Sequence, residues 1–148
     1  MIGVIIMKDS KDLLSSILKT TQLGQVGIRS VMKARIGSDL KTALKSQLKE
    51  YDAIENEANA LVKKNNWDVP QLSHSIEKMT DFMTRTRLSF GNTDSKAAAM
   101  MINGNTRGMI KSLKHLHHYN QSHHQLEEIA NKLLACEKAN IQQMQGFV

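Results

Sequence analysis

Apolar side chains recur every three or four positions along most of this chain, and this spacing constrains the fold more than any other feature. In residues 10–34 one such stripe consists of Leu14, Ile17, Leu18, Thr21, Gln25, Ile28, Val31 and Met32. A spacing of three and four is typical of an amphipathic helix, whereas a half-buried strand alternates every second residue. The chain also has one proline and 4% aromatic residues, which disfavours a β-sandwich. The sequence therefore predicts an all-α protein.

The same pattern predicts four long helices and one additional segment. The long helices are expected over residues 10–34, 39–65, 94–118 and 122–145, and a further helical segment over residues 70–90. The breaks within the first pair and within the last pair are only a few residues long, so each pair should form an antiparallel hairpin. The segment between the hairpins can carry the chain from one end of a bundle to the other. We therefore expect a four-helix bundle with an extra helical segment in the crossover.

Length and composition fit one domain, because the 148 residues include 41% hydrophobic and 23% charged residues. We expect residues 9–148 to form the bundle and residues 1–8 to be a flexible or oligomer-contacting tail, with Met7 as an alternative start to Met1. The apolar N-terminal run is too short for a membrane span and lacks the basic flank of a secretory signal. The lone Cys136 excludes an intramolecular disulfide and is expected to be a buried, inert thiol. These features favour a cytoplasmic location.

One part of the chain carries a resemblance to a known family. It reads Asp39-Leu40-Lys41-Thr42-Ala43-Leu44, then Gln47-Leu48-Lys49-Glu50-Tyr51, then Ile54 and a break at Asn66-Trp67. The basic and apolar opening, the long helix with an acidic centre and the terminal aromatic resemble the relatives of spore coat protein F and other bacterial bundles of the ferritin-like superfamily. The resemblance implies a ferritin-like four-helix bundle, in which two antiparallel hairpins are joined by one long crossover.

The resemblance also implies where a metal centre would lie. Ferritin-like enzymes hold two metal ions with a glutamate from each of two helices and a Glu-x-x-His pair from each of the other two. The corresponding positions of this chain read Gln25, Glu55-x-x-Ala58, Asn105 and Glu137-x-x-Asn140. Two carboxylates and no histidine remain, and residues 95–120 contain no Asp or Glu. Glu55 and Glu137 are therefore candidate ligands for one weakly bound divalent metal, while an active di-metal centre is disfavoured.

A metal-free alternative uses the same positions as a central polar layer. The amides of Gln25, Asn105 and Asn140 can hydrogen-bond Glu55 and Glu137 and fix the helix register without a cation. We favour this alternative, with no cofactor, no catalytic residue and no small-molecule substrate identified. It describes a non-catalytic, homo-oligomeric ferritin-like bundle with a degenerate metal site, acting in assembly, in stress or in a spore. The competing hypothesis is a metal-binding ferritin-like protein for iron, manganese or zinc.

Three other features have weaker functional interpretations. The stretch from His115 to His124 holds five histidines, which can bind metals, although a solvated turn is the simpler interpretation. The formal net charge is +6, which leaves association with nucleic acid as a lesser alternative. The basic residues concerned are Arg29, Lys33, Arg35, Lys41, Lys45, Lys111 and Lys114. Four glycines inside predicted helices are expected to allow close helix approach, namely Gly24, Gly27, Gly104 and Gly108.

Overall fold

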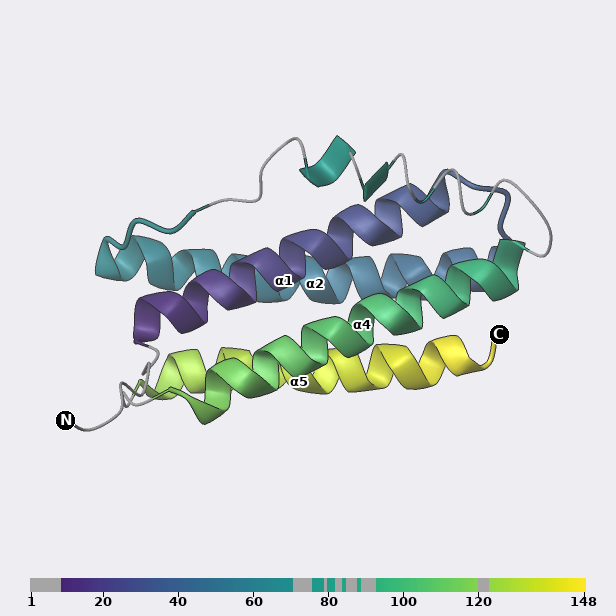
Figure 1. Ribbon diagram of the computed structural model, residues 1–148. Coiled ribbons are helices and arrows are strands. Elements are labelled where there is room, and N and C mark those ends of the chain that lie inside the picture. The colour runs from purple at the N-terminus through teal and green to yellow at the C-terminus, as the bar shows by residue number, and fades with distance from the viewer. Residues whose placement is uncertain are drawn as a thin grey trace.

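Four long helices form the structure, which is a computed structural model that describes residues 9–70, 76–78, 80, 81, 84, 88, 93–119 and 123–148. The helices are α1 (Ser10–Met32), α2 (Ser38–Asn65), α4 (Thr93–His117) and α5 (His124–Gln145), as Figure 1 shows. The four helices predicted from the apolar spacing are confirmed, with ends that agree within two residues. The predicted tail at residues 1–8 and much of the predicted segment at 70–90 lie outside the described residues.

Local sequence signals fix several helix ends. The side chain of Asp9 accepts a hydrogen bond from the Asp12 amide at 2.8 Å, and the Asp12 side chain accepts one from the Asp9 amide at 3.3 Å. This reciprocal pair is a capping box and explains why α1 begins here. At the end of α2, Asn66 adopts a left-handed conformation with φ of 53°, which ends the helix. At the start of α5, His123 Nδ1 accepts a hydrogen bond from the Leu126 amide at 3.3 Å.

Contacts between helix ends fix the direction in which the helices run. Ser10 Oγ at the start of α1 lies 2.8 Å from Tyr119 Oη just after α4, so these two helices are antiparallel. The Gly37 amide before α2 donates to Asp94 Oδ1 in the first turn of α4 at 2.8 Å, so α2 and α4 begin at the same end. The end of α2 and the start of α4 therefore lie at opposite ends of the bundle, as Figure 1 shows. The predicted all-α bundle with two antiparallel hairpins is confirmed, and the helical crossover stays a prediction.

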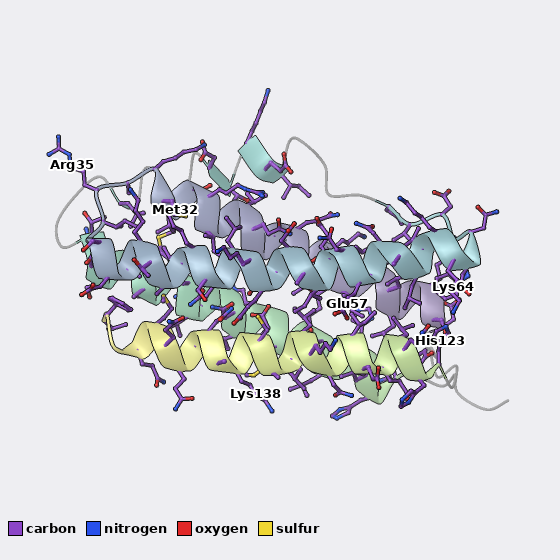
Figure 2. All side chains as sticks on the ribbon, turned by 180° about the vertical axis from the view of Figure 1, so that it is seen from behind. Met32, Arg35, Glu57, Lys64, His123 and Lys138 are labelled. Carbon is purple, nitrogen blue, oxygen red and sulfur yellow. The ribbon has the colours of Figure 1, made fainter. Side chains whose placement is uncertain are left out.

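Helices α2 and α5 also lie side by side and run in opposite directions. Gln47 Nε2 donates to Gln143 Oε1 at 2.8 Å, and about three turns further along α2 the Glu57 carboxylate accepts from Lys132 Nζ at 3.0 Å. Figure 2, seen from behind, shows Glu57 on the edge of α2 that faces α5. These contacts set the register of the second hairpin against the first.

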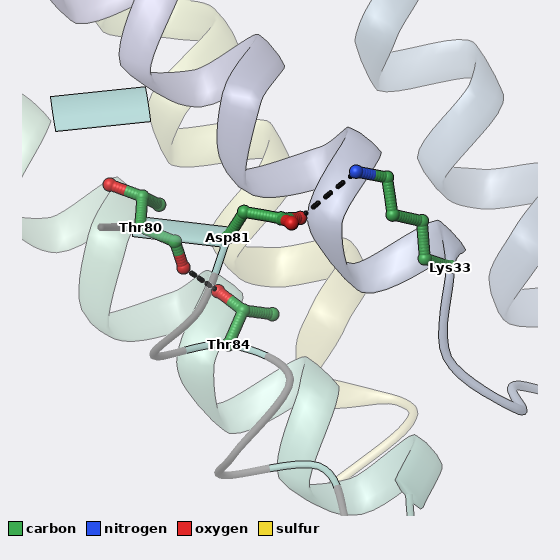
Figure 3. Close-up of polar contacts among 4 residues, drawn as sticks. All are labelled: Lys33, Thr80, Asp81 and Thr84. Carbon is green, nitrogen blue, oxygen red and sulfur yellow. Dashed lines mark hydrogen bonds and ion pairs between the residues drawn. The ribbon is translucent and has the colours of Figure 1, made fainter. Parts of the chain in front are cut away.

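The described part of the crossover is attached to the end of α1. Lys33 Nζ, just after α1, lies 3.1 Å from Asp81 Oδ1 of the crossover, and Thr84 Oγ1 donates to the Thr80 carbonyl oxygen at 2.8 Å (Figure 3). Thr84 is buried, so this part of the crossover packs against the bundle. The described crossover residues therefore lie against the bundle beside α1.

Apolar side chains from all four helices form the core. They include Leu13, Leu14, Ile17, Leu18, Leu40, Leu44, Ile54, Ala97, Ala98, Leu126, Leu133 and Met144, all buried. None of the described helices combines the length and the apolar character that crossing a lipid bilayer requires.

Candidate functional site

The polar centre of the bundle is built around the hydroxyl group of Tyr51. This side chain on α2 is 1% exposed, and its Oη lies 2.7 Å from Asn105 Oδ1 on α4 and 2.9 Å from Glu137 Oε1 on α5. A buried tyrosine hydroxyl needs such partners. The three side chains, here called the Tyr51 cluster, therefore connect three of the four helices inside the protein.

Two glycines make room for the Tyr51 cluster. A Cβ atom placed on Gly24 of α1 would lie 2.7 Å from Cζ of Tyr51, and one on Gly108 of α4 would lie 3.2 Å from Oε1 of Glu137. A side chain at Gly24 would force the Tyr51 ring to move. A Cβ atom on Gly108 would also lie 3.2 Å from Cγ2 of Thr20 on α1. At these two glycines α1 and α4 therefore lie close to side chains of neighbouring helices.

The protonation of the Tyr51 cluster follows from its burial. Burial raises the pKa of Glu137 to about 7, and the hydrogen bond from Tyr51 opposes this rise. Burial, followed by the negative charge of Glu137, raises the pKa of Tyr51 far above its ordinary range, so the phenol keeps its hydrogen. One phenol hydrogen can serve only one acceptor. A protonated Glu137 resolves this, because it can donate to Tyr51 Oη while Tyr51 donates to Asn105 Oδ1.

The donors in the cluster do not fit the metal centre that the resemblance implies. They are one carboxyl group, one amide and a phenol that keeps its hydrogen, whereas a ferritin-like di-metal centre uses four glutamates and two histidines. Glu55 and Glu137 line different hollows, so they do not form the expected shared site. Across the part of the chain that the structure describes, no three His, Cys, Asp or Glu side chains are grouped so as to hold a metal ion.

The predicted polar layer is brought together only in part. Four of its members are buried, namely Gln25, Asn105, Glu137 and Asn140. Asn105 and Glu137 meet at the Tyr51 hydroxyl, and a hydrogen bond from Asn140 opposes the rise in the Tyr51 pKa. Asn140 Nδ2 lies 3.5 Å from Sγ of Cys136, and Gln25 Oε1 accepts from Arg29 at 3.3 Å. Glu55 is only half-buried and lines a surface hollow together with Gln25. The expectation that Glu55 lies in the central layer is therefore corrected.

Tyr51 takes the central position that was expected for Glu55. The two residues are one helical turn apart on α2, so they share a stripe, and spacing alone does not say which turn meets the other helices. A usable signal was present in the sequence, since a tyrosine within an apolar stripe carries a hydroxyl that needs a partner once buried.

A half-open cavity of about 350 Å³ adjoins the Tyr51 cluster between α1, α4 and the crossover. Its walls are mostly apolar or lack side chains, with Leu23, Gly27, Val31, Met100, Met101 and Gly104, and the crossover adds Thr80 and Thr84. Arg107 and Lys111 of α4 contribute positive charge to the lining, and both are exposed. Pockets of several hundred Å³ with apolar walls and a few polar groups are typical small-molecule sites.

The polar side of this cavity is formed by the Tyr51 cluster itself. Asn105 and Glu137 both line the cavity, and they are 3% and 1% exposed. Asn105 Nδ2 and Glu137 Oε2 have no hydrogen-bond partner among the described residues. These two atoms are buried beneath the cavity wall, where each exposes less than 1 Å².

The remaining candidate groups have local structural roles. Burial, followed by a 3.3 Å hydrogen bond to Glu50 Oε2, raises the pKa of the Cys136 thiol to about 12. The expectation that this thiol is buried is confirmed, and its inertness stays a prediction. His118 Nδ1 lies 2.7 Å from the Lys114 carbonyl oxygen within one turn of helix. His124 pairs with Glu128 in the first turn of α5 at 3.0 Å, and both side chains are exposed. These contacts are those of a solvated turn.

Comparison of the chain with protein-family models, with curated proteins and with solved structures gives no match. The ferritin-like resemblance therefore stays a prediction.

Proposed function

We propose that this chain is a non-catalytic binding protein, a metal-independent helical bundle of ferritin-like architecture that takes up a small molecule in the cavity beside the Tyr51 cluster. The observation that carries the proposal is the buried Tyr51 hydroxyl in contact with both Asn105 and Glu137. A hydrogen-bonded phenol occupies the polar centre in which a ferritin-like protein would hold metal ions between carboxylates.

Binding is favoured over turnover because the groups suited to catalysis are held protonated. The Cys136 thiol has a pKa of about 12, and the pKa of Tyr51 is higher still. A nucleophile needs a depressed pKa or an adjacent base. Glu137 titrates near neutral pH, but one of its oxygens is already engaged with Tyr51. This leaves a site that can hold a ligand by hydrogen bonds.

The topology supports the ferritin-like part of the proposal. The first of two antiparallel hairpins ends at the opposite end of the bundle from the start of the second, and ferritin-like folds span such a separation with one long crossover. Exposed Leu23 on α1 and Ile110 on α4 supply apolar surface for a homo-oligomer. Assembly, a stress or spore role and a cytoplasmic location stay predictions, and so do the metal-binding and nucleic-acid alternatives.

Metal analysis tests the proposal. Protein purified from cells grown with added iron, manganese and zinc should contain far less than one metal ion per chain. Its melting temperature should be unchanged by a chelator, because the Tyr51 hydroxyl rather than a cation contacts the Glu137 carboxyl group. The Glu55→Gln and Glu137→Gln variants serve as controls, and the chelator should leave their melting temperatures unchanged as well. A fall of several degrees in the wild type, restored by adding one of these metals, would refute metal independence and favour the metal-binding alternative.

A further inference from the structure

We infer that the cavity binds an apolar carboxylate, a molecule whose chain lies between α1 and α4 and whose anionic head group lies beside Arg107 and Lys111. The inference rests on the proposed function and names the ligand class for that site. It stands on two observations: glycines leave room between these helices, and two basic side chains line one end of that room.

Glycines lie in the middle of the cavity lining on both helices. The lining of α1 follows one face of the helix, at spacings of four, three and four residues, with Thr20, Gly24, Gly27 and Val31. The same spacing occurs along α4, with Met100, Gly104, Arg107 and Lys111. A Cβ atom on Gly27 or on Gly104 would meet nothing within 4 Å, so close packing does not require a glycine at either position. Glycine destabilises a helix relative to alanine, so these two residues keep space open at a cost in stability.

The cavity has a basic end and an apolar end. A Cβ atom on Gly108 would lie 3.2 Å from Cγ2 of Thr20, so Thr20 lies beside the last lining turn of α4, which is the basic one. Val31 lies eleven residues, or about 16 Å, further along α1. Because α1 and α4 are antiparallel, Val31 faces the start of the lining on α4, which is Met100 and Met101. A molecule with one charged end and one apolar end matches this arrangement.

Arg107 and Lys111 are available to an anion. They are exposed and one helical turn apart, and within the part of the chain that the structure describes no hydrogen bond or ion pair holds either of them. A positive charge close to Glu137 would oppose the rise in its pKa, but the opposing contribution comes from the Tyr51 hydrogen bond. Two like charges at this helical spacing repel each other. One carboxylate between them relieves the repulsion and accepts charge-assisted hydrogen bonds from both.

The other charges near the cavity do not oppose a carboxylate. Glu137 is the one carboxyl group among the described lining residues, and its Oε2 exposes less than 1 Å². Its pKa of about 7 keeps it mostly protonated near pH 6. On the crossover, Asp81 is paired with Lys33 and lies outside the lining. The cavity therefore offers positive charge to a ligand, which attracts a carboxylate and repels an ammonium group.

The volume of the cavity limits the length of the ligand. At roughly 30 Å³ for each non-hydrogen atom, the share that a water molecule has in the liquid, about 350 Å³ has room for about ten such atoms. Octanoate has this size and is therefore the probe. Its neutral counterpart is 1-octanol, which has the same chain and no charge.

A pair of variants tests the head group. Arg107→Gln combined with Lys111→Gln removes both positive charges from the lining. The matched control combines Lys114→Gln with Lys138→Gln, which removes two positive charges at exposed positions outside the lining. The two proteins therefore have the same net charge and differ in the place from which it was removed.

A second pair of variants tests the cavity. Gly104 lies between lining residues one turn away on either side, and its Cβ would meet nothing within 4 Å, so Gly104→Leu should fill the cavity without a clash at its Cβ. The matched control is Asn103→Leu, which adds the same side chain at the neighbouring exposed position outside the lining.

The experiment follows chemical shifts of the ¹⁵N-labelled full chain at about pH 6 while octanoate or 1-octanol is added. Octanoate should bind the wild type with a Kd of about 1 mM, a reasonable value for ten non-hydrogen atoms. Loss of Arg107 and Lys111 together should weaken octanoate at least about 10-fold and leave the Kd of 1-octanol unchanged. Gly104→Leu should weaken both probes at least about 10-fold, whereas both control proteins should bind both probes as the wild type does.

The outcomes separate the head group from the cavity. A loss of octanoate affinity that is confined to the Arg107 and Lys111 variant and to Gly104→Leu would support the inference. Equal octanoate affinity in the two charge variants, with both probes lost in Gly104→Leu, would overturn the carboxylate inference while leaving the cavity as a binding site. Octanoate binding that survives Gly104→Leu lies elsewhere on the protein and would also overturn it. Absence of binding by both probes would overturn the inference and the proposed function together.

Discussion

Replacing Glu137 with glutamine should remove a pH dependence from the stability of the protein. In the folded chain burial raises the pKa of Glu137 from its ordinary value of 4.5 to about 7. The folded state therefore holds a proton on this residue over a range of pH in which the unfolded chain has released it. The stability associated with this proton is fully present below pH 4.5 and is lost as the pH rises towards about 7.

The size of the effect follows from the same two pKa values. A difference of about 1.4 kcal/mol for each unit of pKa gives about 3 kcal/mol between acidic and neutral pH. Glutamine resembles the protonated glutamic acid, since its amide group can donate to Tyr51 Oη and has no charge to bury. The Glu137→Gln variant should therefore match the wild type near pH 4.5 and exceed its stability by about 3 kcal/mol above pH 7.5, or roughly 10 °C in melting temperature.

Urea unfolding followed by far-UV circular dichroism at several pH values measures this difference. Subtracting the variant from the wild type at each pH removes the titration of the other carboxyl groups. Glu55→Gln is the matched control, because Glu55 is a half-buried carboxylate outside the Tyr51 cluster. A difference between wild type and Glu137→Gln that stays flat with pH, or that favours the wild type at high pH, would refute the reasoning.

Two further predictions concern the packing of the cluster. Gly24→Ala should destabilise the protein by about 1–3 kcal/mol, because its Cβ would lie 2.7 Å from the Tyr51 ring. Gly27→Ala should instead stabilise it by about 0.5–1 kcal/mol, because its Cβ meets nothing within 4 Å. Thermal unfolding of the two variants measures the difference, and equal effects would contradict the packing of Tyr51 against Gly24. Tyr51→Phe should cost about 1–3 kcal/mol in urea unfolding, since Asn105 and Glu137 lose their shared partner; a neutral substitution would show that the hydroxyl is not needed.

The four long helices could be predicted from the sequence because the residue pattern that specifies each helix is local. Apolar spacing and the breaks around Gly37 and Asn66 depend on neighbours within one or two turns, and the observed helix ends follow them. A long connection between α2 and α4 could also be predicted, since the short breaks within each pair of helices require hairpins and leave one long segment between them.

The residues that form the polar centre could be predicted from the sequence only in part. The burial of Glu137 and Asn105 follows from their places on apolar stripes. The choice between Tyr51 and Glu55 depends on how deeply each turn of α2 meets α4 and α5, which is set by tertiary packing. The same limit applies to the glycines, because no local signal shows that the space beside Gly24 is filled from another helix.

The Tyr51 cluster also has a consequence for the order in which the protein folds. Each hairpin can form from contacts that are close in sequence, whereas the two contacts of Tyr51 join residues 54 and 86 positions apart. Such contacts require long loops to close, so they should form after the hairpins have begun to pair. An interaction that forms late contributes little to the folding rate and mainly slows unfolding. The Tyr51 hydroxyl should thus slow unfolding and lengthen the time for which the two hairpins stay packed together.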